Sequence, residues 1–244
     1  ILNENPENAV IHSKARNIEL GPIDHPDLFE VGLTKNNRPF SGAHIMENMP
    51  LTEQRVMRSH LRPEFMPDML FETKPKTILL TRNPKDVAVS LFNFHHNNST
   101  LAPVEWDDFI REFCNENTEY GSYFQYVIDW DAYSDEPWVL AVRFEDIKKS
   151  PQEHIEKIAD FLGKSLTNEQ LKEVARVTDF QFMKSHFGYP EAWQMRQGTR
   201  LQRKGTVGDW KNVFTVSQNE AFDSIYDKKM EGYEHLKYNF LDDY

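Results

Sequence analysis

Disulfide chemistry is absent from this sequence, because Cys114 is the only cysteine among its 244 residues. A single thiol excludes an intrachain disulfide and is typical of a reducing compartment. Long apolar runs are also absent: residues 77–80 and 138–142 are strand-sized and fall well short of the roughly 20 residues that cross a bilayer. No secretory signal is visible. We therefore expect a soluble, cytoplasmic protein that has no membrane partner.

Positive charge is scarce as well. The chain carries 28 Lys and Arg residues against 39 Asp and Glu residues, which gives a formal net charge of −11. This balance argues against a nucleic-acid or anionic-membrane surface spread over the whole protein. Any anionic ligand must therefore be bound locally.

Three well-known binding motifs are missing too. The sequence contains no G-x-x-x-x-G-K-[ST], which makes a P-loop kinase or NTPase a weak hypothesis, and no G-x-G-x-x-G of a dinucleotide-binding fold. It also lacks metal-ligand spacing, since His95 and His96 are adjacent and have no cysteine partner. We expect no metal, and we give these two histidines a surface or acceptor-pocket role.

The hydrophobic pattern alternates between strand-like and helix-like segments from residue 64 onward. Residues 76–82 and 138–144 are short apolar runs of the kind buried in parallel sheets, and Thr167 with Gln170 forms a capping box that opens a helix. Other helices are predicted at about residues 84–97, 105–114, 120–134 and 151–162. No repeat or linker divides the chain. We expect one α/β domain over residues 1–244, with a central parallel sheet flanked by helices.

A candidate anion site follows the first of these strands, in the stretch RNPKDVAVS at 82–90. Asn83 is the predicted N-cap and Pro84 the first helical residue. Because helix N-termini at the carboxyl ends of parallel strands offer free N–H groups to anions, a phosphate could reach Arg82 and the hydroxyl of Ser90. The alternative is purely structural: Arg82 would pair with Asp86 or a carbonyl group, and Ser90 would be an ordinary helix residue.

A second candidate lies in RKGTVGDWKNVFT at 203–215. Arg203 and Lys204 stand beside Gly205, so two charges and a backbone N–H can converge on one small anion without a Cβ in the way. A solvated surface loop is the alternative. Neither stretch is specific by itself.

Together the two stretches resemble the nucleotide-binding signatures of the cytosolic sulfotransferases. The resemblance extends to RVMRSHL at 55–61, to residues 142–163 and to VTDFQFMK at 177–184, all in family order. It implies a P-loop-NTPase-like sulfotransferase fold. It also implies transfer of a sulfuryl group from 3′-phosphoadenosine 5′-phosphosulfate to a hydroxyl or amine of a small molecule.

The same resemblance implies the cofactor contacts. Thr178 and Phe180 match positions beside the adenine, where a ring can stack on the base; without the family, Phe180 would be read as core. The donor's 3′-phosphate is expected at Arg82, Ser90, Arg203, Lys204 and Gly205.

His60 matches the catalytic base of the family. An imidazole of near-neutral pKa can take the proton from an acceptor hydroxyl as it attacks sulfur. Arg58 stands where the family usually has a lysine, and could serve the sulfate or the leaving phosphate. As one of nine histidines, His60 would otherwise have a structural role.

Three departures from the family pattern are visible. Phe144 replaces a frequent tyrosine, and Leu201 replaces a frequent aromatic residue. The family's phosphosulfate loop, of the Pro-Lys-Ser-Gly-Thr-Thr-Trp type, does not occur, nor does the strand before it. The chain also opens on Ile1 instead of Met. A sheet without its first strand would leave unpaired backbone groups and a hole in the core, so we expect an N-terminally incomplete sequence.

The family resemblance also predicts a homodimer. KNVFTVSQNE at 211–220 fits the segment Lys-x-x-x-Thr-Val-x-x-x-Glu through which relatives pair. The four matching residues are Lys211, Thr215, Val216 and Glu220. The structural alternative is a helix start with Thr215 as N-cap, which is compatible with pairing.

Two functions remain open: an active sulfotransferase, and a nucleotide-binding relative that has lost catalysis. The acceptor is expected between residues 20–54, predicted as loops, and residues 185–200. Phe187, Tyr189 and Trp193 favour a flat, apolar or phenolic molecule, although these rings could equally be packing.

Overall fold

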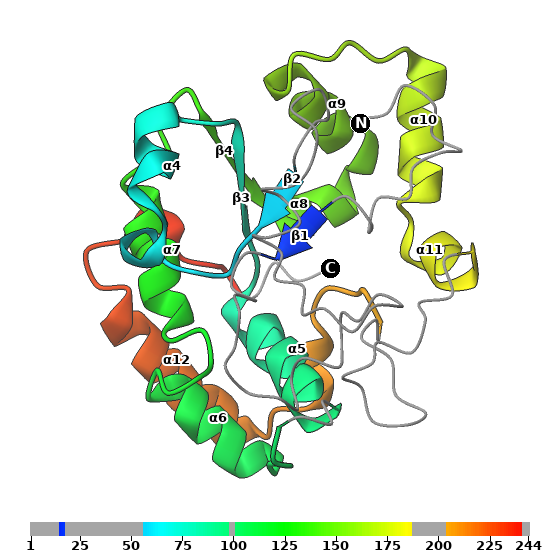
Figure 1. Ribbon diagram of the computed structural model, residues 1–244. Coiled ribbons are helices and arrows are strands. Elements are labelled where there is room, and N and C mark those ends of the chain that lie inside the picture. The colour runs from blue at the N-terminus through cyan, green and yellow to red at the C-terminus, as the bar shows by residue number, and fades with distance from the viewer. Residues whose placement is uncertain (1–14, 18–55, 98–100, 187–203, 241–244) are drawn as a thin grey trace, which may run out of the picture.

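The computed structural model describes residues 15–17, 56–97, 101–186 and 204–240 (Figure 1). The described segments alternate between strands and helices from β3 to α9, which confirms the α/β class. The strands are β1 (Ala15–Asn17), β2 (Val56–Arg58), β3 (Thr77–Thr81) and β4 (Val139–Arg143). The α-helices are α4 (Asp68–Thr73), α5 (Pro84–Asn97), α6 (Trp106–Cys114), α7 (Tyr123–Asp131), α8 (Phe144–Lys149), α9 (Pro151–Phe161), α10 (Asn168–Val177), α11 (Phe180–His186) and α12 (Val216–Lys229). The 3-10 turns are η3 (Pro63–Phe65), η4 (Asp209–Asn212) and η5 (Glu234–Leu236).

The two predicted strands pair in parallel as β3 and β4, with Leu79 opposite Ala141. Leu79 and Val139 are buried with Trp130 and Trp138, because apolar side chains on one face of the pair pack against α7 and the turn before β4. Figure 1 shows α4, α6, α7 and α12 on one side of the strands and α9, α10 and α11 on the other. The prediction of a parallel sheet flanked by helices is therefore confirmed.

The described strands form two separate parallel pairs, β1 with β2 and β3 with β4. Within the described residues β3 has one partner strand, so its second edge is unpaired there. Ile78 and Leu80 are 40% and 48% exposed, although they belong to a central apolar strand. The described part of the chain thus leaves one face of β3 incompletely covered.

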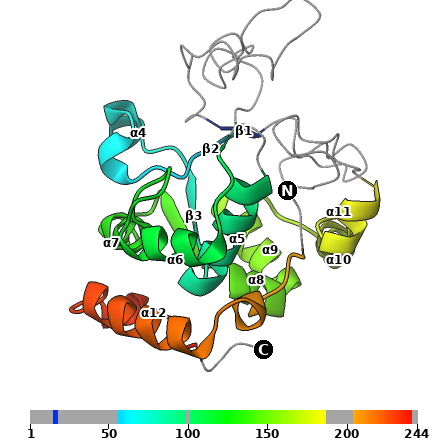
Figure 2. The same cartoon turned by 90° about the horizontal axis from the view of Figure 1, so that it is seen from below.

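An aromatic core joins α6, α7 and α12 to α5. Its largest buried members are Phe109, Phe113, Phe124, Phe222 and Tyr226. Burial of these rings stabilises the packing of the four helices against one another. The packing also brings the C-terminal helix beside the helix that follows β3 (Figure 2).

Most helix boundaries agree with the sequence prediction, and α5 spans the predicted residues 84–97. The capping box of Thr167 and Gln170 is present at the start of α10. The predicted start of α7 at residue 120 was wrong. Gly121 has a left-handed φ of 72°, and Ser122 caps the helix by accepting a hydrogen bond from the backbone N–H of Gln125.

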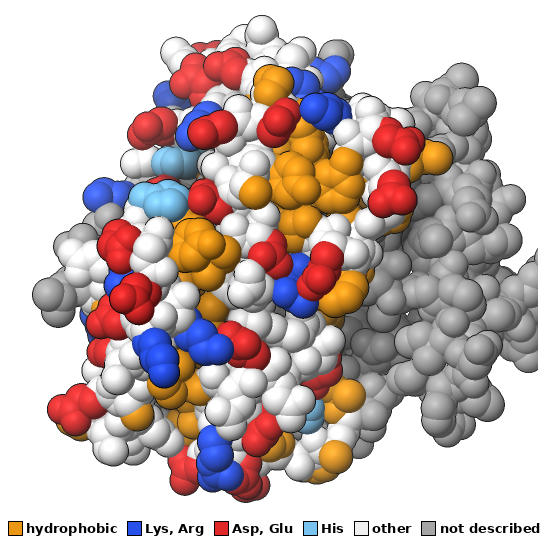
Figure 3. All heavy atoms as spheres, turned by 90° about the vertical axis from the view of Figure 1, so that its left-hand side faces the viewer, with side chains coloured by type: hydrophobic (Ala, Val, Ile, Leu, Met, Phe, Trp, Pro, Cys, Tyr) orange, Lys and Arg blue, Asp and Glu red, His pale blue; other side chains and the backbone are white. Residues whose placement is uncertain are grey.

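The surface in Figure 3 carries acidic and basic side chains interspersed over the face formed by α4, α7, α6 and α12. This face therefore has no concentrated basic patch. Within the described ranges, no helix combines the length and apolar character needed to cross a bilayer. The same part of the chain holds no group of three side chains suited to a metal ion.

Candidate cofactor site and active site

The turn after β3 forms as the sequence predicts. Asn83 caps α5, because its side-chain oxygen accepts a hydrogen bond of 2.9 Å from the backbone N–H of Lys85. Its own N–H donates to the Glu145 carboxylate at 2.8 Å, which ties the turn to the end of β4. Burial raises the pKa of Glu145 above its usual value. The start of α5 is thereby fixed beside the carboxyl ends of both strands.

Arg82 lies between β3 and this helix start. Its Nη2 donates to the carbonyl oxygen of Thr206 at 2.9 Å and lies 3.4 Å from Asp86, while Phe144 packs 4.6 Å from the guanidinium carbon. Arg82 therefore makes both contacts of the purely structural alternative, one to the Asp86 carboxylate and one to a backbone carbonyl. The guanidinium is nevertheless not saturated, because its buried Nε has no hydrogen-bond partner.

Asp86 connects the two candidate stretches. Its buried carboxylate accepts hydrogen bonds from the backbone N–H groups of Gly208 at 2.8 Å and Trp210 at 3.0 Å. Charge-assisted bonds of this kind are the stronger class of protein hydrogen bond. The loop that carries Lys204 and Gly205 is thus held against the first turn of α5.

Gly205 lies against Phe180, and the approach leaves no room for a side chain. With Gly205 at a φ of 65°, a Cβ atom would stand 2.4 Å from Cδ2 of the Phe180 ring. Phe180 begins α11, directly after Thr178 has ended α10. The Thr178 hydroxyl donates to the carbonyl oxygen of Val174 at 2.7 Å. The structure therefore brings Phe180 and Gly205 together.

The other predicted cofactor residues have different settings. Lys204 is half exposed, and its ammonium group lies 2.6 Å from Asp209. Ser90 is exposed on α5. Arg203 lies outside the described residues.

The predicted catalytic residues follow a different strand. Arg58 ends β2 and His60 comes two residues later, and both are exposed. The His60 ring lies 4.6 Å from the ring of Tyr120, centroid to centroid, at an interplanar angle of 33°. The short segment between α6 and α7 thus supplies an aromatic wall beside His60.

Sequence reasoning missed Lys85, which is a 0% exposed ammonium. Its Nζ lies 2.7 Å from Asn219 and 2.5 Å from Asp223, both on α12, and 4.3 Å from the centre of the Trp210 ring. Buried ammonium groups require such partners. Lys85 and Asp86 therefore hold α12 and the preceding loop to α5. The only signal in the sequence was two adjacent charged residues in the first turn of a helix that packs in the core.

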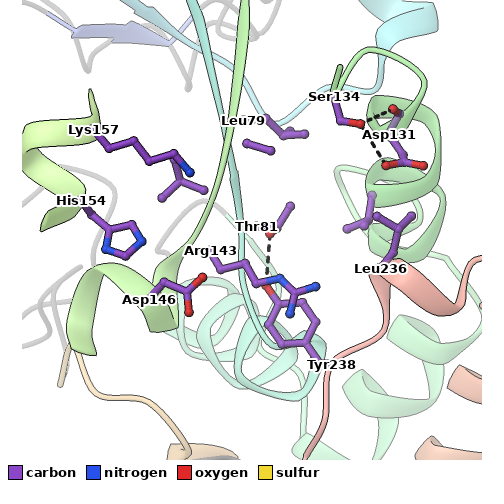
Figure 4. Close-up of a pocket in the computed structure, with 13 residues that line it drawn as sticks. Leu79, Thr81, Asp131, Ser134, Arg143, Asp146, His154, Lys157, Leu236 and Tyr238 are labelled. Carbon is purple, nitrogen blue, oxygen red and sulfur yellow. Dashed lines mark hydrogen bonds between the residues drawn. The ribbon is translucent and has the colours of Figure 1, made fainter. Parts of the chain in front are cut away.

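A cavity of about 250 Å³ lies between β4, α7, α8 and α9 (Figure 4). Its walls carry charges of both signs, from Arg143 and Lys157 to Asp131 and Asp146. Asp131 also lies 2.8 Å from His235. Among the sequence-predicted site residues that the structure describes, none lines this cavity, and its mixed charge does not select a class of ligand.

A phosphate-bearing nucleotide fits the site at the carboxyl end of β3. The unpartnered Nε of Arg82 provides a charged donor, and the bare backbone of Gly205 provides a close approach beside the Phe180 ring. The sequence-predicted cofactor residues that the structure describes are Arg82, Ser90, Thr178, Phe180, Lys204 and Gly205.

Comparison with known sequences agrees with this chemistry. The family model described as "Sulfotransferase domain" matches residues 7–234. Mouse sulfotransferase 1B1 is 37% identical over 198 residues, which cover 79% of this chain and 66% of the relative. The guinea-pig 3-alpha-hydroxysteroid sulfotransferase is 41% identical over 186 residues, which cover 74% of this chain and 65% of the relative. The chain thus spans just under two thirds of the length of these curated relatives.

Solved structures give the same match. Mouse sulfotransferase SULT7A1 complexed with PAP superposes with a TM-score of 0.72 at 30% identity, covering 80% of this chain and 71% of the other. Retinol dehydratase in a complex with retinol and PAP gives a TM-score of 0.76 at 26% identity, covering 96% of this chain and 69% of the other. Both neighbours carry the same nucleotide, PAP, in structures of this fold.

Proposed function

Since the chain belongs to the sulfotransferase family, we propose that the protein transfers a sulfuryl group from 3′-phosphoadenosine 5′-phosphosulfate to a hydroxyl or amine of a small acceptor. The observation that carries the proposal is the joining of the two nucleotide-binding stretches by Asp86. Two segments far apart in the sequence then offer the Arg82 guanidinium and the backbone of Gly205 to the same ligand.

The 3′-phosphate is the group to which these residues are suited. Arg82 offers an unpartnered Nε, and the loop of Arg203, Lys204 and Gly205 offers two further charges. Ser90 adds a hydroxyl donor. Thr178 and Phe180 are assigned to the adenine, because a ring held against Gly205 can stack on the base.

His60 is assigned as the general base. The bound donor supplies the sulfuryl group; the imidazole takes the proton of the acceptor hydroxyl as the acceptor oxygen bonds to sulfur and the bond from sulfur to the bridging phosphate oxygen breaks. Arg58 neutralises negative charge that builds on the oxygens around sulfur. As in phosphoryl transfer, the remaining task of the protein is positioning.

The acceptor is proposed to be small and apolar or phenolic. Tyr120 beside His60 provides one aromatic wall, and the matched proteins include a 3-alpha-hydroxysteroid sulfotransferase and a retinol dehydratase bound to retinol. Residues 20–54 and most of 185–200, from which the other walls were predicted, lie outside the described residues.

A homodimer in the cytoplasm is part of the same proposal. Val216 is 76% exposed at the first position of α12, and Lys211, Thr215 and Glu220 are exposed around it. An exposed valine between an exposed cation and an exposed anion suits a small two-fold contact. Thr215 also forms the capping box of α12 with Gln218, so the structure has the predicted helix start, which is compatible with pairing.

Two measurements on the full-length protein test the proposal. Calorimetry with adenosine 3′,5′-bisphosphate should show binding that Arg203→Ala weakens about 10- to 150-fold, the loss of one charged hydrogen bond. Turnover with labelled donor should then appear with one of the phenols, steroids, amines or catechols in a screen. Binding without transfer to any of them would favour the relative that has lost catalysis, and no binding would overturn the site.

A further inference from the structure

Tyr123 makes two hydrogen bonds to the backbone of one residue, Arg82. The N–H of Arg82 donates to the Tyr123 hydroxyl at 2.8 Å, and the same hydroxyl donates to the carbonyl oxygen of Arg82 at 2.7 Å. The two residues are 41 positions apart. One side chain thus satisfies both backbone groups of the residue that carries the unpartnered guanidinium nitrogen.

This contact lies where the strand ladder ends. The pairing of β3 with β4 stops at Thr81 opposite Arg143, so Arg82 is the first residue beyond the ladder. A residue at this point would otherwise need other partners for its N–H and C=O groups. The hydroxyl of Tyr123 takes the place of a neighbouring strand and fixes the backbone conformation of Arg82.

Tyr123 itself is held firmly. It is the first residue of α7, whose start is fixed by the Ser122 cap, and its ring stacks on Tyr126 at 5.9 Å with an interplanar angle of 15°. Burial raises the pKa of Tyr123 well above its usual value, so the hydroxyl keeps the proton that it donates to Arg82.

We propose that Tyr123 is a positioning residue for the nucleotide: by holding the backbone of Arg82, it directs the Arg82 guanidinium toward the 3′-phosphate. This inference rests on the proposed function, because it takes the ligand of Arg82 to be that phosphate. Tyr123 touches neither the nucleotide nor the reacting atoms in this scheme, and it acts only through Arg82.

The test compares Tyr123→Phe with Tyr133→Phe in the full-length protein. Tyr133 follows the same helix, and its hydroxyl makes no hydrogen bond to the described residues, so its loss controls for removal of a tyrosine hydroxyl. Tyr123→Phe should weaken binding of adenosine 3′,5′-bisphosphate about tenfold, which corresponds to about 1.4 kcal/mol. Turnover at saturating donor should stay within about threefold of the parent, and Tyr133→Phe should leave both values unchanged.

A double-mutant cycle separates positioning from general loosening of the structure. In an Arg82→Ala background, Tyr123→Phe should cause no further loss of affinity, because the residue through which it acts is gone. A full tenfold loss in that background would overturn the proposal, as would parent-like affinity in Tyr123→Phe alone. If Arg82→Ala itself leaves the affinity unchanged, the proposed nucleotide site is wrong. If Arg82→Ala lowers the affinity and Tyr123→Phe does not, the site is supported and the positioning role of Tyr123 is wrong. Unfolding in urea confirms that each variant is folded at the temperature of measurement.

Discussion

The carboxylate of Asp86 accepts a hydrogen bond from the backbone N–H of Gly208 at 2.8 Å across 122 positions of sequence. A second bond, from the N–H of Trp210 at 3.0 Å, completes a two-point attachment. The helix start after β3 and the glycine-containing loop near the C-terminus therefore behave as one unit. We therefore expect a change in this attachment to alter binding of the proposed nucleotide.

Replacing Asp86 should both destabilise the fold and lower the affinity for the nucleotide. Asp86→Ala leaves the buried N–H of Trp210 and the partly buried N–H of Gly208 without an acceptor, so we expect a loss of about 2–4 kcal/mol in the free energy of unfolding. Asp86→Asn keeps one acceptor oxygen and should fall between the alanine variant and the parent. Urea unfolding measures both, and calorimetry with adenosine 3′,5′-bisphosphate should rank the affinities in the same order.

Asp108→Ala is the matched control for Asp86→Ala. Asp108 forms an exposed ion pair with Arg111 at 3.0 Å, and such pairs contribute about 0–1 kcal/mol. An Asp86→Ala variant as stable as Asp108→Ala would show that the two backbone bonds are dispensable.

The buried ammonium of Lys85 predicts an asymmetry between the two partners of one ion pair. Asp223→Asn weakens the attraction on a charge that is 0% exposed, whereas Lys85→Met leaves a carboxylate that is 38% exposed and can be hydrated. We expect the first change to cost about 3–5 kcal/mol of stability and the second clearly less. Urea unfolding of both variants decides the order.

The control for this pair is Asp227→Asn, since the side chain of Asp227 is 72% exposed in its contact with Lys237. Its cost should be at most about 1 kcal/mol. A Lys85→Met variant that is less stable than Asp223→Asn would contradict the idea that burial of the cation dominates.

Local chemistry explains why much of the fold was predictable. The apolar runs at 77–81 and 139–143 formed a parallel pair, and α5 has its predicted bounds because Asn83 and Pro84 act within one turn. The family motifs likewise identified Phe180 and Gly205, which the structure brings together.

Long-range contacts explain why the rest was not predictable. Tyr123 falls within the helix predicted at about residues 120–134, and nothing in its spacing indicates that its hydroxyl contacts Arg82. Similarly, one partner of Lys85, Asn219, lies 134 positions away in the sequence. The first pair depends on how α7 packs beside the end of β3 and the second on how α12 packs on α5, and hydrophobic periodicity does not predict either arrangement.

The contact of Gly205 with Phe180 predicts a specific effect of an added methyl group. Gly205→Ala places a Cβ atom 2.4 Å from the ring, so the ring or the loop must move. We expect nucleotide affinity to fall at least about tenfold, because one base-stacking contact is worth roughly 1–3 kcal/mol. Calorimetry with adenosine 3′,5′-bisphosphate gives the value.

Gly163→Ala controls for backbone strain in this experiment. Gly163 has a φ of 71°, close to the 65° of Gly205, but a Cβ there meets nothing within 4 Å. Both variants therefore share the cost of about 1–2 kcal/mol for a left-handed alanine. Only Gly205→Ala should lower the affinity for the nucleotide. Equal affinities in the two variants would argue against a role for the Phe180 contact.

His60→Ala should abolish turnover while nucleotide binding is retained. General base catalysis contributes about 10²- to 10⁴-fold, and that is the expected loss in kcat in the full-length protein. Affinity for adenosine 3′,5′-bisphosphate should stay within a few-fold, because His60 follows β2, whereas Arg82, the proposed phosphate ligand, follows β3. Near-normal kcat would exclude His60 as the base. Tyr120→Phe, which keeps the ring beside His60, is the control and should retain most of the activity.

The exposed Val216 predicts a weak homodimer that one charge can dissociate. The Val216 side chain is 76% exposed, so folding of the monomer buries little of its apolar surface. That surface is available for contact with a second copy. An interface built on so short a segment should bury less than about 1,200 Å², and pairing of Lys211 with Glu220 across the two-fold axis should make it sensitive to salt. Light scattering at micromolar concentration should therefore show a dimer that weakens as salt is raised.

Val216→Glu should convert this dimer to a monomer, because the two-fold axis places the added carboxylates next to each other. The change should leave the fold intact: Val216 is the first residue of α12, where an acidic side chain favours the helix, and the Thr215 cap is unaffected. The matched control is Ser224→Glu, an exposed position farther along the same helix, which adds the same charge away from the segment and should remain dimeric. A monomeric parent protein would defeat the dimer hypothesis outright. A Val216→Glu variant that stays dimeric would place the interface on another surface. An interface centred on residue 216 would bring the two added carboxylates together, and their repulsion would dissociate it.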